Sequence, residues 1–146
     1  MPAQEEDPRR FNTIAMLGQA YSLLGFRIVD GVVGAGFPQK PSWSAVFAQI
    51  RREGSRLTQL ATGANMTAQS MGELVDDLES IGYVERHPDP TDRRAKLIKL
   101  TRRGRQAVGA GEATIVGLED ELLDLLGPTD YDHLRRILRI ILDASD

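Results

Sequence analysis

Basic side chains gather in one short stretch of an otherwise acidic chain of 146 residues. Residues 83–105 hold eight Lys and Arg side chains against three Asp and Glu, a net charge of +5. The rest of the chain holds ten basic and 18 acidic side chains, a net charge of −8. Positive charge concentrated in this way is typical of a surface that binds nucleic-acid phosphates. Arg93 and Lys96 are the side chains that we expect to contact phosphates there.

The segment before this basic stretch predicts a helix that can enter a DNA groove. Thr67 is placed to cap it, and Met71, Leu74, Val75 and Leu78 follow at helical spacing as its buried face. The outward positions near its start are the candidate DNA contacts: Thr67, Gln69, Ser70, Gly72 and Glu73. Hydroxyls suit phosphate oxygens, glutamine can pair with adenine, glutamate can accept from cytosine N4, and the glycine allows close approach.

The surrounding elements form a recognisable order. Residues 57–61 have the spacing of a short helix that stops at Gly63-Ala-Asn65, and Gly82 is placed to end the second helix. Residues 83–87 and 96–100 read as two strands around a charged turn at 88–92. Helix, turn, helix and hairpin is the winged helix-turn-helix pattern, in which the second helix enters the major groove.

The stretch DPTDRRAKLIKLTRRG at residues 89–104, following MTAQSM at 66–71, resembles the wing signature of MarR-type bacterial transcriptional regulators. The resemblance implies a mainly α winged-helix fold and a homodimer that binds a palindromic operator in double-stranded DNA. It implies that Arg94 enters the minor groove and that Asp92 orients it. It also implies release of DNA by a small aromatic or amphipathic effector, as in a repressor.

The flanking segments predict long helices. Residues 1–7 read as a disordered tail, residues 8–36 and 105–146 as a helical dimerisation region, and residues 37–104 as the DNA-binding domain. Residues 42–53 are a further helix candidate, capped by Ser42 or Ser44, while Gly127-Pro128 should stop the long C-terminal helix before Asp130 caps another. The aliphatic faces of the terminal helices predict packing against a second subunit, although a self-contained monomeric bundle is the alternative.

Aromatic residues and one arginine could line an effector crevice between these helices and the winged domain. The candidates are Tyr21, Phe26, Arg27, Trp43 and Phe47. The alternative is that these aromatic side chains belong to the core, because aromatic residues at helical spacing usually do.

The predicted recognition helix has an acidic exposed face, which is unusual opposite phosphate. It carries Glu73, Asp76, Asp77 and Glu79 but no Lys or Arg. These carboxylates either face solvent and neighbouring arginines, which we favour for Asp77 and Glu79, or read bases. The acidic face also keeps open a second function, a winged helix that binds protein instead of DNA.

Composition argues against several other classes. The chain has no cysteine, which excludes disulfides and thiol sensing. Its two histidines, His87 and His133, have no companions spaced for a metal site or a triad, and no phosphate loop or dinucleotide fingerprint is present. We therefore expect no enzyme activity and no cofactor. The acidic N-terminus and the lack of a long apolar run predict a cytoplasmic protein without a membrane span.

Overall fold

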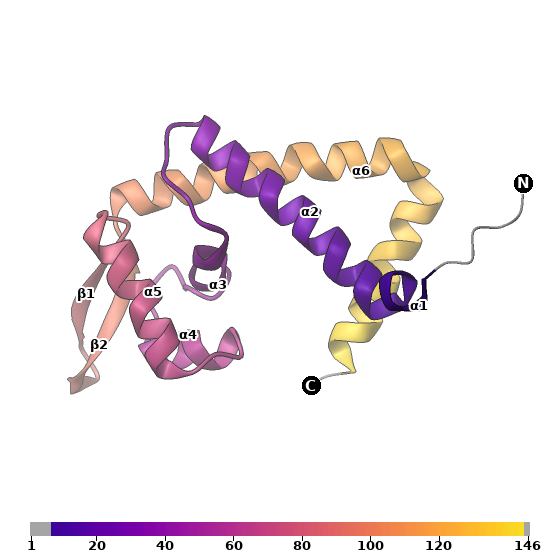
Figure 1. Ribbon diagram of the computed structural model, residues 1–146. Helices are drawn as coiled ribbons and strands as arrows, with labels where there is room; N and C mark the ends of the chain where they lie inside the picture. The colour runs from indigo at the N-terminus through magenta and orange to yellow at the C-terminus, as the bar shows by residue number, and fades with distance from the viewer. Residues whose placement is uncertain (1–6, 145–146) are drawn as a thin grey trace, which may run out of the picture.

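The computed structural model describes residues 7–144 and is mostly helical, as the sequence predicted. Two long helices, α2 (Thr13–Gly34) and α6 (Arg102–Asp143), cross and form an arm at one end of the molecule (Figure 1). The other end is a winged unit made of the 3-10 helix η1 and the elements between it and β2. Its elements are η1 (Pro41–Trp43), α3 (Ser44–Phe47), α4 (Leu57–Gly63), α5 (Ala68–Ser80), β1 (Val84–Asp89) and β2 (Asp92–Leu100).

The core of the winged unit is formed by the face that the apolar spacing predicted. Met71, Val75 and Leu78 of α5 are fully buried, and Leu74 is half-buried. They pack with Tyr83, whose hydroxyl donates to the carbonyl of Pro38 at 2.7 Å. Burial of this aliphatic and aromatic surface is the main force that holds α5 in place.

Local signals set the ends of α4 and α5 as expected. Asn65 takes a positive φ of 53° in the turn between the two helices, and Gly82 takes a φ of 77° after α5. The Thr67 hydroxyl accepts the Ser70 N–H at 3.1 Å, which caps α5. Thr101 caps α6 in the same way through the Gly104 N–H at 3.0 Å.

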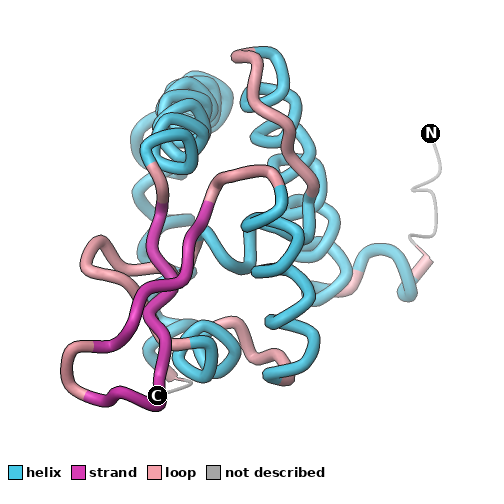
Figure 2. The backbone as a smooth tube through the Cα atoms, turned by 90° about the vertical axis from the view of Figure 1, so that its left-hand side faces the viewer, coloured by secondary structure: helices cyan, strands magenta, loops and turns pink. Residues whose placement is uncertain are grey.

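The hairpin of β1 and β2, which we call the wing, is antiparallel and longer toward its tip than predicted (Figure 2). The sequence placed residues 88–92 outside the strands, but β1 runs to Asp89 and β2 starts at Asp92. Ser55 bonds Ile98 on one edge of β2, and β1 pairs with the other edge, so β1 is an edge strand. An edge strand tolerates Pro88 because the missing N–H is not needed for a further partner. The backbone N–H and carbonyl of Ser55 bond those of Ile98 at 3.0 and 2.8 Å.

The helix predicted over residues 42–53 is wrong in length and in its cap. Helix α3 ends at Phe47, and Ser42 and Ser44 lie within η1 and α3 instead of capping a helix with their side chains. The chain has to turn after Phe47 so that Ser55 can pair with β2. The Ser55 hydroxyl stabilises that turn by accepting the Arg51 N–H at 3.0 Å.

The terminal helices also differ in detail from the prediction. Asn12 interrupts the first one, separating α1 (Pro8–Phe11) from α2, and caps α2 through the Ala15 N–H at 2.9 Å. Asp7, the last residue of the predicted tail, caps α1, whereas residues 1–6 lie outside the described part of the chain. Gly127 breaks α6 with a φ of 74°, as predicted, but the helix resumes at once, so Asp130 lies inside it and is not its cap.

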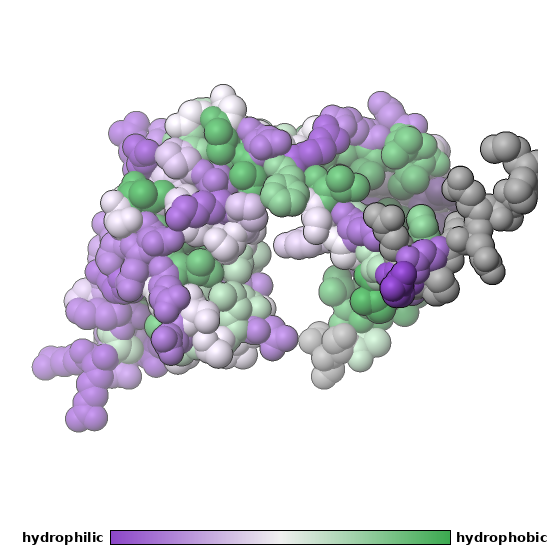
Figure 3. Space-filling model, in the orientation of Figure 1, coloured by the Kyte–Doolittle hydropathy of each residue, from purple (hydrophilic) through white to green (hydrophobic). Residues whose placement is uncertain are grey.

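Helices α2 and α6 approach each other closely where they cross. A Cβ atom on Gly31 would lie 2.2 Å from the Thr114 hydroxyl oxygen, so any larger residue at that point would force Thr114 or one of the helices to move. Further along the same crossing, Arg27 pairs with Glu121 at 2.7 Å. Beyond it, many large apolar side chains of both helices are exposed, and they form the green surface on the right of Figure 3.

Candidate nucleic-acid interface

The first turns of α5 present the polar residues that the sequence singled out. Thr67, Gln69, Ser70 and Glu73 are exposed, and Gly72 is half-buried. The Thr67 hydroxyl also donates to the Ser70 hydroxyl at 3.0 Å, so the two groups form one small polar cluster at the helix start. A helix N-terminus with exposed hydroxyls suits phosphate, because its backbone amides carry partial positive charge.

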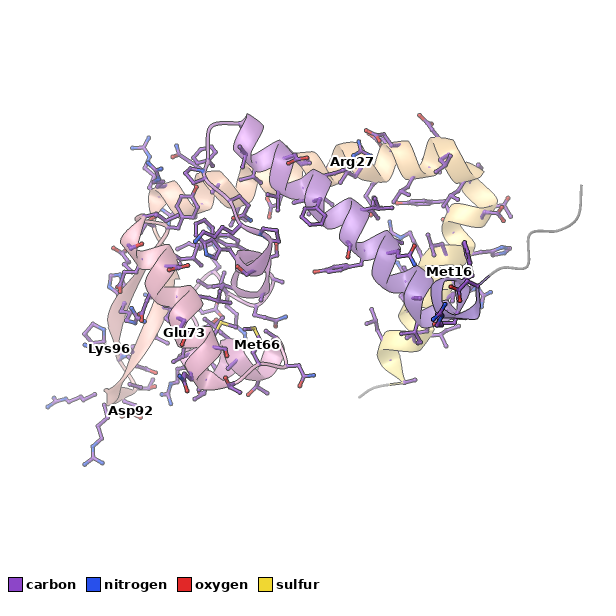
Figure 4. The ribbon with its side chains drawn as sticks, in the orientation of Figure 1. Met16, Arg27, Met66, Glu73, Asp92 and Lys96 are labelled. Carbon is purple, nitrogen blue, oxygen red and sulfur yellow. The ribbon has the colours of Figure 1, made fainter. Side chains whose placement is uncertain are left out.

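Most of the acidic face of α5 is used within the winged unit. Arg86 of β1 pairs with Asp76 at 2.6 Å and with Glu79, while Asp77 pairs with Lys40 at 3.3 Å. These three carboxylates therefore have basic partners of their own, as we favoured for Asp77 and Glu79. Glu73 lies nearer the start of α5 and is exposed, which keeps it available for a base (Figure 4).

The wing tip, residues 89–94, carries its basic side chains outward together with Lys96 of β2. Arg93, Arg94 and Lys96 are all exposed, and the hydrophilic side chains at the tip form the purple projection at the lower left of Figure 3. Asp92 accepts the backbone N–H of Arg94 at 3.0 Å. This bond fixes the main chain from which the Arg94 side chain projects. Asp92 and Lys96 are labelled along the wing in Figure 4.

The structure adds two residues that the sequence reasoning did not select. Arg56, just before α4, reaches across to Asp89 at the wing tip, with Nη2 and Oδ2 2.6 Å apart. Asp89 is only 6% exposed. The Thr91 hydroxyl at 2.7 Å and backbone N–H at 2.8 Å, together with Arg56, lower the pKa of Asp89 from its ordinary 3.8 to about 2. No sequence signal links Arg56 to Asp89, because they lie on different elements.

The five proposed effector residues do not gather in one crevice. Trp43 is buried in the core against Tyr83, as the alternative interpretation held, and Arg27 is tied to Glu121. Tyr21 and Phe26 are exposed on α2, at 74% and 60%, and together line a separate shallow hollow of about 150 Å³ beside Pro41 and Ser44. Only Phe47 lines the cavity described next.

A cavity of about 250 Å³ lies between α2, α3 and α6. Its walls are mainly apolar and include Ile28, Val32, Phe47 and Ile115, whereas Gln39, Ser44 and Glu112 contribute polar groups. The side-chain oxygen of Gln39 is buried without a hydrogen-bond partner. An apolar cavity with one unsatisfied acceptor can take an aromatic ligand that donates one hydrogen bond.

Residues 7–144 contain no group of three or more His, Asp or Glu side chains arranged to hold a metal ion. Within the same residues, no helix is long and apolar enough to cross a membrane.

Known proteins resemble this chain in sequence and in fold. The family model described as MarR family matches residues 40–95, which include α4, α5 and most of the wing. The transcriptional regulator HosA of Escherichia coli O111:H- is 24% identical over 105 residues, covering 72% of this chain and 78% of HosA.

Among solved structures, the transcriptional repressor CouR bound to a 23-mer DNA duplex has a TM-score of 0.76 at 22% identity. The match covers 96% of this chain and 99% of that one. CouR from Rhodococcus jostii RHA1 bound to p-coumaroyl-CoA has a TM-score of 0.70 at 23% identity, covering 97% of this chain and 95% of that one. At these identities the structures show a shared fold. The family match spans the helix-turn-helix and most of the wing, so the likeness in sequence to MarR-family regulators lies in the part of the chain that carries the candidate DNA contacts.

Proposed function

We propose that the protein regulates transcription by binding double-stranded DNA with α5 in the major groove and the wing tip in the neighbouring minor groove. The observation that carries this proposal is the placement of the two candidate contacts. The N-terminal half of α5 and the basic wing tip lie at the same edge of the winged unit, the lower edge in Figure 1. One duplex can therefore touch both.

Residue roles follow from chemistry. Thr67, Ser70, Arg93 and Lys96 bind phosphate oxygens, while Gln69 and Glu73 face base edges across the space that Gly72 leaves open. Arg94 enters the minor groove, where a narrow A·T tract attracts a guanidinium. Asp92 supports Arg94 from the main chain.

The chain acts as a homodimer in this proposal, with residues 8–36 and 105–146 as the dimerisation region and residues 37–104 as the DNA-binding domain. Exposed leucines and isoleucines of α2 and α6 are the surface that a second copy would cover. A two-fold dimer recognises an inverted repeat, with its two α5 helices about 34 Å apart. Such a regulator works on bacterial DNA in the cytoplasm and needs no enzyme activity.

A small aromatic or amphipathic effector is proposed to release the DNA. The cavity between α2, α3 and α6 joins the crossed helices to the winged unit, so a ligand there can change the angle between them. The CouR structure with p-coumaroyl-CoA shows that a protein of this fold can hold an aromatic ligand. The ligand acts by favouring a spacing of the two α5 helices that does not fit the operator.

Binding to the DNA upstream of the protein's own gene tests the proposal. A fluorescent duplex from that region should bind, and its affinity should fall by about 10³ or more between ~50 and ~200 mM salt if six or more phosphates are contacted. Arg94→Ala should weaken binding by roughly 1–3 kcal/mol at fixed salt.

A protein-binding winged helix is the competing function, and the acidic face of α5 favours it. Since Asp76, Asp77 and Glu79 are paired within the chain, that face is less available to a protein partner than the sequence suggested. Binding that hardly changes with salt, or an Arg94→Ala variant with unchanged affinity, would contradict the DNA proposal.

A further inference from the structure

Arg56 stands at the junction between the helix-turn-helix and the wing. Its backbone precedes α4, and its N–H donates to the side-chain oxygen of Gln59 at 2.9 Å, so its main chain is fixed by that helix. The residue before it, Ser55, is paired with β2. Arg56 is thus anchored at its backbone, whereas its side chain points to the wing tip.

The guanidinium of Arg56 contacts several residues of the wing tip at once. Nε and Nη2 lie 2.7 and 2.6 Å from the same oxygen of Asp89, and Nη1 lies 3.9 Å from Asp92. Nη2 is also 3.5 Å from the Thr91 hydroxyl, which donates to the other oxygen of Asp89. The Asp89 carboxylate is therefore held on one side by its own turn and on the other by α4.

Burial makes this contact stronger than an ordinary surface ion pair. The side chain of Asp89 is 5% exposed and that of Arg56 is 37% exposed, so the carboxylate is the buried member. Removing the partner of a buried charge leaves that charge unpaired and poorly solvated, whereas exposed pairs contribute little. The other ion pairs of the wing differ, since Asp76 and Glu79 beside Arg86 are 70% and 41% exposed.

The wing tip needs such a contact because the sheet gives it little support. Among residues 7–144, Ser55 is the one residue outside β1 and β2 that pairs with this sheet, and it pairs with Ile98 toward the base of the wing. Beyond that point the wing is a two-stranded ribbon, and such ribbons are marginally stable and bend readily. The pairing register is also irregular between Pro88 and Asp89.

We propose that Arg56 is a positioning residue for DNA recognition, which holds the wing tip at a fixed place relative to α5 through Asp89. This inference rests on the proposed DNA-binding function. We call the ion pair between Arg56 and Asp89 the clamp. Without it, the wing tip samples many positions, and Arg94 reaches the minor groove only in some of them. The loss of affinity then comes from the wing and not from a contact between Arg56 and DNA.

The alternative is that Arg56 contacts a DNA phosphate directly. A substitution at Asp89 distinguishes these two roles of Arg56. If Arg56 bound phosphate itself, replacing Asp89 by asparagine would free the guanidinium, and affinity would stay the same or rise. If Arg56 acts through the wing, Asp89→Asn weakens binding as Arg56→Ala does. The asparagine would keep the shape of the side chain, and its oxygen can still accept the Thr91 N–H. Its NH2 group then faces the guanidinium, so both the charge pair and the hydrogen bonds with Arg56 are lost.

The experiment measures DNA affinity and the motion of the wing tip in one set of variants: Arg56→Ala, Arg56→Lys, Asp89→Asn and the control Arg52→Ala. Arg52→Ala removes the same charge from an exposed loop residue. The affinity of each variant for the upstream duplex is measured by fluorescence anisotropy, with and without Arg94→Ala. Since the chain has no cysteine, Pro90→Cys at the turn provides a single spin-label site in every variant.

We expect Arg56→Ala and Asp89→Asn to weaken binding about tenfold and to make the spin label more mobile, while Arg56→Lys is intermediate and Arg52→Ala resembles the wild type. The factor by which Arg94→Ala weakens DNA binding should be at least about fivefold smaller in the Arg56→Ala background than in the wild type.

Two results would contradict the proposed role of Arg56. One is that the losses of DNA affinity caused by Arg56→Ala and Arg94→Ala are additive, and the other is that the spin-label spectrum is unchanged in Asp89→Asn. Thermal unfolding shows whether each variant is folded. If Arg56→Ala is not, the affinities and spin-label spectra of Asp89→Asn and Arg56→Lys decide whether Arg56 positions the wing tip. If the wild type does not bind the duplex, the DNA-binding function fails, and the spin label still shows separately whether Arg56 holds the tip.

Discussion

Asp89 keeps its negative charge into strongly acidic solution because its own turn surrounds it with donors. The Thr91 hydroxyl has the largest effect, the Thr91 backbone N–H adds to it, and Arg56 supplies the remainder, so the pKa falls to about 2 although burial opposes this. A carboxyl whose pKa is lower in the folded state stabilises the fold fully above its unfolded pKa. That contribution is lost as the pH falls through the folded pKa.

Protonation of Asp89 should make the protein less stable in acid. The wild type should lose stability between about pH 4 and about pH 2 partly through protonation of Asp89. Asp89→Asn should be less stable than the wild type near neutral pH, and the gap should narrow as the pH falls through this window. Urea unfolding midpoints measured across the range check this.

A control variant shows whether the effect belongs to Asp89. Asp124→Asn removes an exposed carboxylate of α6 outside the wing. A gap for Asp89→Asn that stays constant down to about pH 2, or one that narrows equally for Asp124→Asn, would mean that the Asp89 interactions do not govern acid stability.

At the scale of the elements, short-range signals made α4, α5 and the start of α6 predictable. Thr67 and Thr101 cap their helices through the amide three residues on, and Asn65 and Gly82 supply the positive φ values between elements. Each signal acts within one turn of the chain, so the sequence contains all of it. The inward face of α5 was predictable for the same reason.

Long-range pairing is what the sequence did not reveal. Nothing in residues 48–53 indicates that Ser55 pairs with Ile98, yet this pairing ends α3 early. The clamp between Arg56 and Asp89 escaped notice in the same way, since ion-pair partners cannot be read from spacing when they lie on different elements. The burial of Trp43 was not predictable for the same reason, because its contact with Tyr83 depends on how η1 packs against the residue that precedes β1.

The junction between the wing and α6 gives a prediction for a single methyl group. A Cβ atom on Gly104 would lie 2.0 Å from the backbone oxygen of Tyr83, which precedes β1, so the first turn of α6 can approach this backbone only without a side chain at Gly104. Gly104→Ala should destabilise the protein by ~1–3 kcal/mol, because backbone atoms on both sides have to move. Chemical denaturation measures this change.

Gly109→Ala is the matched control further along α6. Nothing lies within 4 Å of a Cβ atom at Gly109, and its backbone is helical. Alanine favours a helix over glycine by up to about 1 kcal/mol, so this variant should be as stable as the wild type or more so. Equal destabilisation by both substitutions would show that the close approach to Tyr83 is not the cause.

At the scale of the whole molecule, charge and apolar surface are separated. Hydrophilic side chains cover the wing end in Figure 3, and apolar ones are exposed on the crossed helices. Exposed fractions reach 78% at Ile14 and 79% at Leu125. A monomer in water rarely keeps so much large apolar surface exposed, which is the physical basis for the proposed dimer.

A charge placed on the apolar face of α6 should dissociate the proposed dimer. Ile137 is 48% exposed on the last part of α6, and Ile137→Glu places a charge on the apolar face. Arg139→Glu is the control, since two residues along a helix point to nearly opposite sides. Sedimentation should give twice the 16.1 kDa of one chain for the wild type and for Arg139→Glu, and a lower mass for Ile137→Glu.

The dissociated variant should also lose DNA, although its α5 and wing are unchanged. Two linked reading heads bind an inverted repeat with an avidity that can exceed the affinity of one head by about 10²–10⁴. Ile137→Glu should therefore bind the upstream duplex more weakly by a factor in this range, and the wild type should protect two symmetric half-sites in footprinting. A monomeric wild type, or a dissociated variant that binds as tightly, would show that the apolar face of α2 and α6 serves another purpose.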